Sequence, residues 1–267
     1  MIPAQFGTAL ARLRPSWALD SITDVAFLPG GYSNENFVFR YQAQKYVLRI
    51  PRRAQPYVDH VQESRWYAKL PAHLTALPLA FEEKSGLMLT PWIEGKLLID
   101  AWPDLNEEHL IGYLQRLHQQ LPATIRRYDV GELLAAYGCV GPEFTAESVA
   151  SEALQPSHND LNPWNILVTP TGWITLDWEF AGLNDPLFDL VCLHQGLNLS
   201  AENLPELAAR LLRKSELDPD ISQRLSAAQR SYWLREFAWA DFQLREGNRR
   251  AEIVAQKTQA ASKLKLT

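Results

Sequence analysis

The sequence predicts an α+β protein of two lobes, in which a β-rich N-terminal lobe precedes a mostly helical one. The chain has 267 residues, which is long for one compact domain. Short alternating segments dominate the first 90 residues, whereas helical spacing dominates from about residue 104. We therefore expect an antiparallel sheet with one helix over 1–90, a linker over 91–96, and a helical lobe over 97–267.

The first lobe is predicted to contain strands separated by short turns. Three alternating segments indicate antiparallel strands, a segment with apolar residues at helical spacing follows, and two shorter strands complete the lobe. The predicted strands are 21–28, 36–41, 45–50, 78–82 and 86–90, and the predicted helix is 58–70. Pro91 and Gly95 then interrupt the pattern and mark the linker.

The second lobe is predicted to consist of helices around one polar hairpin. Asn106 is the expected N-cap of its first helix, and Gly138 is expected to end the second. The predicted helices are 106–121, 130–138, 186–195, 203–215 and 221–246. Segments 165–168 and 173–176 flank Thr-Pro-Thr-Gly and indicate a β-hairpin.

Composition excludes several classes of protein. With 26 basic and 31 acidic residues the net charge is −5, so the chain lacks the basic surface that non-specific nucleic-acid binding needs. No stretch approaches the roughly 18 apolar residues that cross a bilayer, and the first residues have no signal-peptide core. Cys139 and Cys192 belong to no metal-binding cluster and are expected to be buried thiols. We expect a cytoplasmic protein with neither nucleic acid nor membrane as a partner.

The stretch SHNDLNPWNILV over 157–168 contains the strongest chemical signal. His158, Asp160 and Asn165 have the H-x-D-x-x-x-x-N spacing of a kinase catalytic loop. Asp177 follows at the end of the next predicted strand, where kinases place a metal-binding aspartate. The spacing therefore predicts a site for phosphoryl transfer.

Phosphoryl transfer explains why these residue types occur together. The reaction needs an aligned acceptor hydroxyl and cations that neutralise charge on the phosphate oxygens. Asp160 can accept the hydroxyl proton, while Asn165 and Asp177 offer oxygen ligands to Mg²⁺. We expect His158 to brace the loop through hydrogen bonds.

The first lobe carries a candidate nucleotide site. The stretch LPGGYSNENFVFR is a strand–turn–strand, in which the amides near Gly30, Gly31 and Asn34 and the Ser33 hydroxyl could cover the phosphates of ATP. It does not match G-x-G-x-x-G, so an ordinary glycine turn is the alternative.

Four further residues complete the predicted nucleotide site. Arg49 in YVLRI falls where kinases place a strand lysine, and Glu63 falls where they place its partner on the next helix. The alternatives are an exposed strand arginine and a solvated helix glutamate. Since Pro91 has no N–H, we expect the Thr90 carbonyl and the Trp92 amide to contact adenine.

Other classes of function compete with the kinase. A metal-dependent hydrolase could use His158, Asp160 and Asp177 as ligands. A protein that binds ATP without turnover is a second alternative, and a chance pattern is a third.

In these motifs the chain resembles the aminoglycoside phosphotransferase and choline kinase superfamily. The resemblance implies a bilobal protein-kinase-like fold. The matching stretches are LPGGYSNENFVFR, YVLRIP, LTPWIEG, HNDLNPWNIL, LDWEFAG and DPLFDLV. The resemblance implies ATP as donor, Mg²⁺ as cofactor, Asp160 as base, Asn165 and Asp177 as metal ligands, and Asp189 as a brace of the loop. The chain looks most similar to bacterial thiamine kinases and choline kinases, with an aminoglycoside or another alcohol as alternative acceptor. A monomer or homodimer is expected.

A wall of the acceptor pocket is predicted on the helix 221–246. Tyr232, Glu236 and Trp239 share one face at helical spacing, and this aromatic and acidic face suits a cationic alcohol. Glu179 and Asp185 would add negative potential. The alternative is that this face is core and that Glu236 pairs with an arginine.

Overall fold

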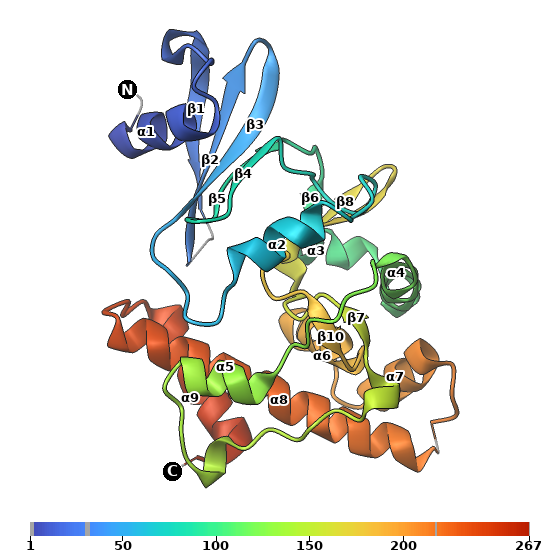
Figure 1. Ribbon diagram of the computed structural model, residues 1–267. Coiled ribbons are helices and arrows are strands. Elements are labelled where there is room, and N and C mark those ends of the chain that lie inside the picture. Colours follow the sequence, from blue (N-terminus) through green and yellow to red (C-terminus); the bar gives the residue numbers. More distant parts are fainter. Residues whose placement is uncertain (1–2, 30–32, 217, 267) are drawn as a thin grey trace. The chain divides into compact units, whose positions relative to one another are not determined.

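The computed structural model describes residues 3–29, 33–216 and 218–266, which form two compact units (Figure 1). Unit 1 is Met1–Leu97 with Ile166–Glu179, and unit 2 is Leu98–Asn165 with Phe180–Thr267. The predicted division into 1–90, 91–96 and 97–267 is retained as a proposal. The compact units differ from it, since the linker and the hairpin segment both group with unit 1.

The main sheet of unit 1 has five antiparallel strands in the order β1-β2-β3-β5-β4. Gln42 and Ala43 join β2 to β3 with φ angles of 47° and 66°, the left-handed backbone that a type I′ hairpin turn requires. The strands are β1 (Ile22–Leu28), β2 (Asn34–Tyr41), β3 (Gln44–Pro51), β4 (Ala80–Glu82) and β5 (Leu87–Pro91). The predicted strand pattern is confirmed.

Two helices accompany this sheet. Helix α1 (Ala4–Leu13) was not predicted, and it packs Phe6 into the sheet core, with ring centroids 5.1 Å from Phe39. Helix α2 (His60–Tyr67) was predicted from residue 58, but it begins later because Asp59 caps it, accepting hydrogen bonds from the amides of residues 61 and 62.

A second sheet of unit 1 consists of β6 (Lys96–Leu97), β8 (Ile166–Thr169) and β9 (Gly172–Thr175). Trp178, which follows this hairpin, is fully buried, stacks on Trp66 with centroids 6.1 Å apart, and donates a 3.0 Å hydrogen bond to Thr75 Oγ1. These contacts explain why the hairpin packs with unit 1 although it lies between segments of unit 2.

Unit 2 is mainly helical. Asn106 caps α4 as predicted, and Gly138 follows α5 with a φ of 79°. Helix α9 was not predicted and runs back along α8 (Figure 1). The helices are α3 (Leu98–Ala101), α4 (Glu107–Gln120), α5 (Val130–Ala136), α6 (Leu187–Gly196), α7 (Leu204–Leu212), α8 (Pro219–Arg245) and α9 (Ala251–Leu264). Strands β7 (Gln155–Ser157) and β10 (Gly182–Asn184) pair with each other.

The helices of the described part of the chain are too short or too polar to span a bilayer. Cys139 and Cys192 are free, buried thiols.

Candidate functional site

The loop after β7 is anchored through its backbone to the buried helix α6. Asp189 accepts hydrogen bonds from the amides of His158 at 2.9 Å and Asn159 at 2.8 Å, and it contacts His118 Nε2 at 2.9 Å. All of residues 187–194 are buried, so this carboxylate lies in a fixed frame. The loop therefore has little freedom to move away from α6.

The side chain of Asn159 also fixes the loop after β7, through hydrogen bonds. Its φ of 67° is left-handed, a conformation that asparagine tolerates better than most residues. Its side-chain amide donates to the carbonyls of Ser157, Phe180 and Gly182, and its oxygen accepts from Asn184 at 2.9 Å. This role of Asn159 was not predicted, although the asparagine lies between two predicted functional residues, His158 and Asp160.

The Asp160 carboxylate is held by three other side chains. Oδ2 accepts from Asn165 Nδ2 at 3.1 Å, and Oδ1 accepts from Asn162 Nδ2 at 3.3 Å and lies 3.2 Å from Arg235 Nη1. The Asp160 side chain is still 23% exposed, so a small acceptor can approach it. His158 is fully buried and its Nδ1 accepts from the Asp160 amide at 3.2 Å.

We expect Asp189→Ala to lower the free energy of unfolding by about 3–5 kcal/mol, because two buried amides and an imidazole lose a charged acceptor. Denaturant unfolding of the variant against the wild type measures this. The control is Asp104→Ala, which removes an exposed carboxylate of unit 2 and should change the midpoint little. An unchanged midpoint for Asp189→Ala would show that the loop does not depend on this anchor.

The same carboxylate predicts a dependence of stability on pH. Burial acts to raise the pKa of Asp189, but the hydrogen bond and charge of His118 and the His158 amide outweigh it and hold the pKa below its ordinary value. A lowered native pKa stabilises the fold above the unfolded value of about 3.9, and this contribution is lost as the pH falls through the native pKa. Asp189→Asn should therefore lose part of the acid dependence of unfolding.

Arg49, Glu63 and Asp177 form an ionic cluster within unit 1, in which Arg49 and Glu63 are buried and Asp177 is 28% exposed. Arg49 Nη1 lies 2.7 Å from Glu63 Oε1 and 3.0 Å from Asp177 Oδ1, and Nη2 donates to Glu63 Oε2 at 2.9 Å. The Arg49 and Glu63 side chains are only 5% and 0% exposed. The alternatives of an exposed strand arginine and a solvated glutamate are therefore wrong.

The charges of this cluster suit a bound cation. One guanidinium faces two carboxylates, so these three side chains carry one net negative charge, and His60 Nδ1 also lies 3.0 Å from Glu63 Oε2. Burial raises the pKa of Asp177 above its ordinary value, and Glu63 acts in the same direction, whereas Arg49 opposes them. Asp177 also has a left-handed φ of 61°. A divalent cation would offset the excess charge, so Asp177 fits the metal-ligand role predicted for it.

Asn165 fits the same role through the orientation of its amide. Its Nδ2 donates to the Asp160 carbonyl at 2.9 Å as well as to the Asp160 carboxylate. The donor side of the amide is thus directed into the loop, and the amide oxygen is the atom left for a hard cation. Among the residues described, no group of three or more His, Cys, Asp or Glu side chains is placed to hold a metal ion.

The predictions for the turn before β2 stay predictions. Gly30 and Gly31 lie outside the described residues. The Ser33 carbonyl accepts from the Arg52 amide at 3.0 Å, and Asn34 is buried at the start of β2. The roles of Ser33 and Asn34 toward ATP stay predictions.

The adenine contact predicted for the Trp92 amide needs correction. This amide donates a 3.0 Å hydrogen bond to the Lys45 carbonyl, because the pairing of β3 with β5 continues one residue beyond Pro91. The donor is therefore already used. The contact of the Thr90 carbonyl stays a prediction.

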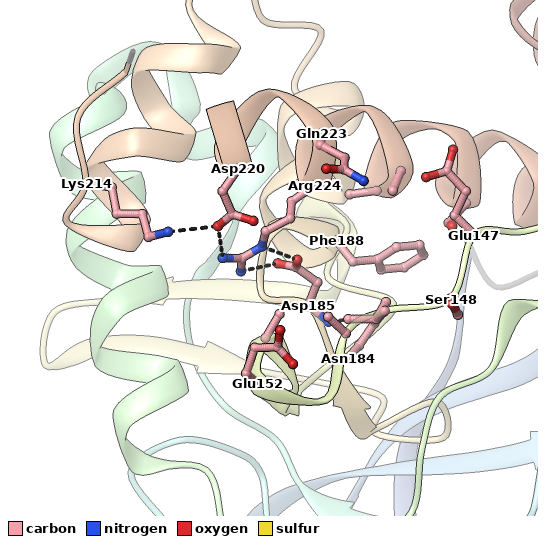
Figure 2. A pocket seen from close by; sticks show the side chains of 16 residues that line it. Glu147, Ser148, Glu152, Asn184, Asp185, Phe188, Lys214, Asp220, Gln223 and Arg224 are labelled. Carbon is pink, nitrogen blue, oxygen red and sulfur yellow. Dashed lines mark hydrogen bonds and ion pairs between the residues drawn. The ribbon is translucent and has the colours of Figure 1, made fainter. Parts of the chain in front are cut away.

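Asp185 does not supply free negative potential. It accepts hydrogen bonds from Arg224 Nε at 2.7 Å and Nη2 at 3.0 Å (Figure 2). It also accepts one from the Leu187 amide at 3.0 Å, at the start of α6. The pair lines a cavity of about 520 Å³ whose lining does not include Asp160. Arg224 pairs with this carboxylate and also lies 3.2 Å from Asp220, and the substrate role of Asp185 stays a prediction.

The predicted acceptor wall on α8 already holds a cation of the protein itself. Arg235 donates to Glu236 Oε1 from Nε at 2.9 Å and from Nη2 at 2.7 Å, and its guanidinium lies 5.2 Å from the Tyr232 ring centroid. Tyr232 and Glu236 therefore face Arg235. This agrees with the alternative prediction, in which Glu236 pairs with an arginine. Trp239 is half-buried and Glu179 is buried, and their roles stay predictions.

Comparison with known proteins identifies the family. The profile of the phosphotransferase enzyme family matches residues 24–226, a span that includes both clusters described above. The chain belongs to this family.

Individual relatives are more distant. Protein LicA of Haemophilus influenzae is 27% identical over 199 residues, 65% of this chain and 58% of that protein. Thiamine kinase of Shigella boydii serotype 4 is 28% identical over 181 residues, 61% of this chain and 63% of that protein. The chain thus matches less than two thirds of the length of these relatives.

Solved structures confirm the predicted fold class. The structure of choline kinase LicA from Streptococcus pneumoniae has a TM-score of 0.72 at 16% identity and covers 91% of this chain and 94% of that one. This chain has the α+β protein-kinase-like fold of the phosphotransferases, with a sheet-bearing unit and a helical unit.

Proposed function

We propose that this chain is a kinase of small molecules, which moves the γ-phosphate of ATP to a hydroxyl group in the presence of Mg²⁺. The observation that carries the proposal is the environment of Asp160. Its carboxylate is accessible at 23% exposure, its loop is fixed by Asp189, and Asn165 binds it directly. Such a carboxylate can accept a proton at a defined point in space.

Each of the predicted residues has a separate role in the proposed reaction. Asp160 accepts the proton of the acceptor hydroxyl as the acceptor oxygen bonds to the γ-phosphorus and the bond to the ADP oxygen breaks. Asn165 and Asp177 would hold Mg²⁺, which supplies charge neutralisation at the phosphates when bound. Arg49 is proposed to bind phosphate oxygens, and its contact with Glu63 fixes the guanidinium.

The proposed acceptor is a small cation with a primary alcohol, and thiamine and choline are the first candidates. This rests on the names of the relatives, a thiamine kinase and a choline kinase, and on the acidic character of the chain, whose net charge is −5. Aminoglycosides and other alcohols are the alternatives within the same class of reaction.

A panel of acceptors tests the proposal. ADP release is measured with thiamine, choline, ethanolamine, homoserine and an aminoglycoside, each with and without Mg²⁺, and the phosphorylated product is identified by mass. We expect phosphorylation of thiamine or choline that depends on Mg²⁺. Nucleotide binding without product on any acceptor would favour a protein that binds ATP without turnover.

Trp239 offers a test of the acceptor side. We expect Trp239→Ala to raise KM for the acceptor by roughly 5- to 30-fold and to leave KM for ATP unchanged, because a lost cation–π contact is worth about 1–2 kcal/mol. Trp102→Ala, a matched truncation of a half-buried tryptophan elsewhere in unit 2, is the control. Equal effects of the two variants on the acceptor KM would contradict a contact at Trp239.

A further inference from the structure

Arg235 is a buried cation that contacts the loop of the proposed base. Its Nη1 donates to the Asn159 carbonyl at 2.6 Å and lies 3.2 Å from Asp160 Oδ1. The side chain is only 7% exposed, although it comes from the middle of α8, 75 residues further along the chain. A buried guanidinium is costly unless its donors are paired, so its position is defined by these contacts.

The other edge of the guanidinium is equally fixed. Nε and Nη2 both donate to Glu236 Oε1, whose second oxygen accepts from Gln256 of α9. Phe188 and Tyr232 lie against it, with ring centroids 5.3 Å and 5.2 Å from Cζ. The planar fork therefore has one orientation, and it presents Nη1 to the loop.

We infer that Arg235 is a positioning residue for the phosphoryl transfer, which aims the Asp160 carboxylate at the acceptor, and that Glu236 holds Arg235 in place. The inference rests on the proposed function. Asn162 and Asn165 hold Asp160 from within its own loop, whereas Arg235 ties it to the helix pair α8–α9. A carboxylate that is held from both sides keeps one orientation. This matters for the rate, because displacing a base by about 1 Å costs as much as about 10²-fold in kcat.

A double-mutant cycle tests this inference. We expect Arg235→Gln to lower kcat by about 10- to 100-fold while KM for ATP changes less than about twofold. In the Asp160→Asn background the same substitution should change kcat by less than about twofold, because the base through which Arg235 acts is already absent. Thermal unfolding is recorded for each variant, and Glu236→Gln provides a second, milder cycle if Arg235→Gln does not fold.

Arg224→Gln is the matched control, since it breaks the pair of another α8 arginine, which is 18% exposed, with the buried carboxylate of Asp185. It should leave kcat near the wild-type value. An equal fall in kcat for Arg224→Gln, or an undiminished effect of Arg235→Gln in the Asp160→Asn background, would overturn the inference while the proposed function stands. A wild-type chain that phosphorylates none of the acceptors would overturn both.

Discussion

Replacing Asp160 by asparagine is expected to lower kcat by about 10²- to 10⁴-fold, because the amide keeps the size of the carboxylate but cannot accept the hydroxyl proton. The loop should keep its structure, since the amides of His158 and Asn159 are bound by Asp189 rather than by Asp160. Steady-state kinetics with the preferred acceptor give kcat, and a nucleotide titration gives the affinity for ATP, which we expect to change little.

The control for this substitution is Asp104→Asn, which makes the same chemical change at an exposed position of unit 2. It should leave kcat and the affinity for ATP as in the wild type. Near-normal turnover of Asp160→Asn would contradict the assignment of the base. A loss of ATP affinity in parallel with kcat would indicate a disturbed structure rather than a missing proton acceptor.

Local sequence patterns predicted most of the elements, because each depends on neighbours in the chain. The β2–β3 hairpin and the cap at Asn106 are of this kind. Helix α1 was not predicted, although Phe6, Leu10 and Leu13 have helical spacing, so the signal was present. The segment 166–179 packs with unit 1 because Trp178 contacts residues far away in the sequence. The spacing of residues along the chain does not reveal such contacts.

In the candidate site, too, local patterns were predictable and contacts between distant residues were not. The spacing of His158, Asp160 and Asn165 places them in one loop, and the structure brings them into contact. The face with Tyr232 and Glu236 was predicted to bind a cation, namely the acceptor. Composition cannot tell whether that cation is a ligand or a side chain, and the structure places Arg235 there. Likewise, no local pattern pairs Asp185 with Arg224.

Replacing Asp177 by alanine is expected to abolish activity at any practical Mg²⁺ concentration, because the charge on the β- and γ-phosphates would no longer be neutralised. Asn165→Ala should be milder and partly rescued by more Mg²⁺, since a neutral amide contributes less than a carboxylate. Initial rates over a Mg²⁺ titration measure both variants. The contacts between Arg49 and Glu63 do not involve Asp177, so unit 1 should remain folded.

Asp177→Asn separates the lost charge from the backbone conformation. Alanine at the left-handed φ of 61° costs about 1–2 kcal/mol, whereas asparagine tolerates this conformation. If the carboxylate acts as a metal ligand, Asp177→Asn should be nearly as inactive as Asp177→Ala while its melting temperature stays closer to that of the wild type. An asparagine variant with the Mg²⁺ dependence of the wild type would show that the metal binds elsewhere, and that the excess negative charge beside Arg49 has another purpose.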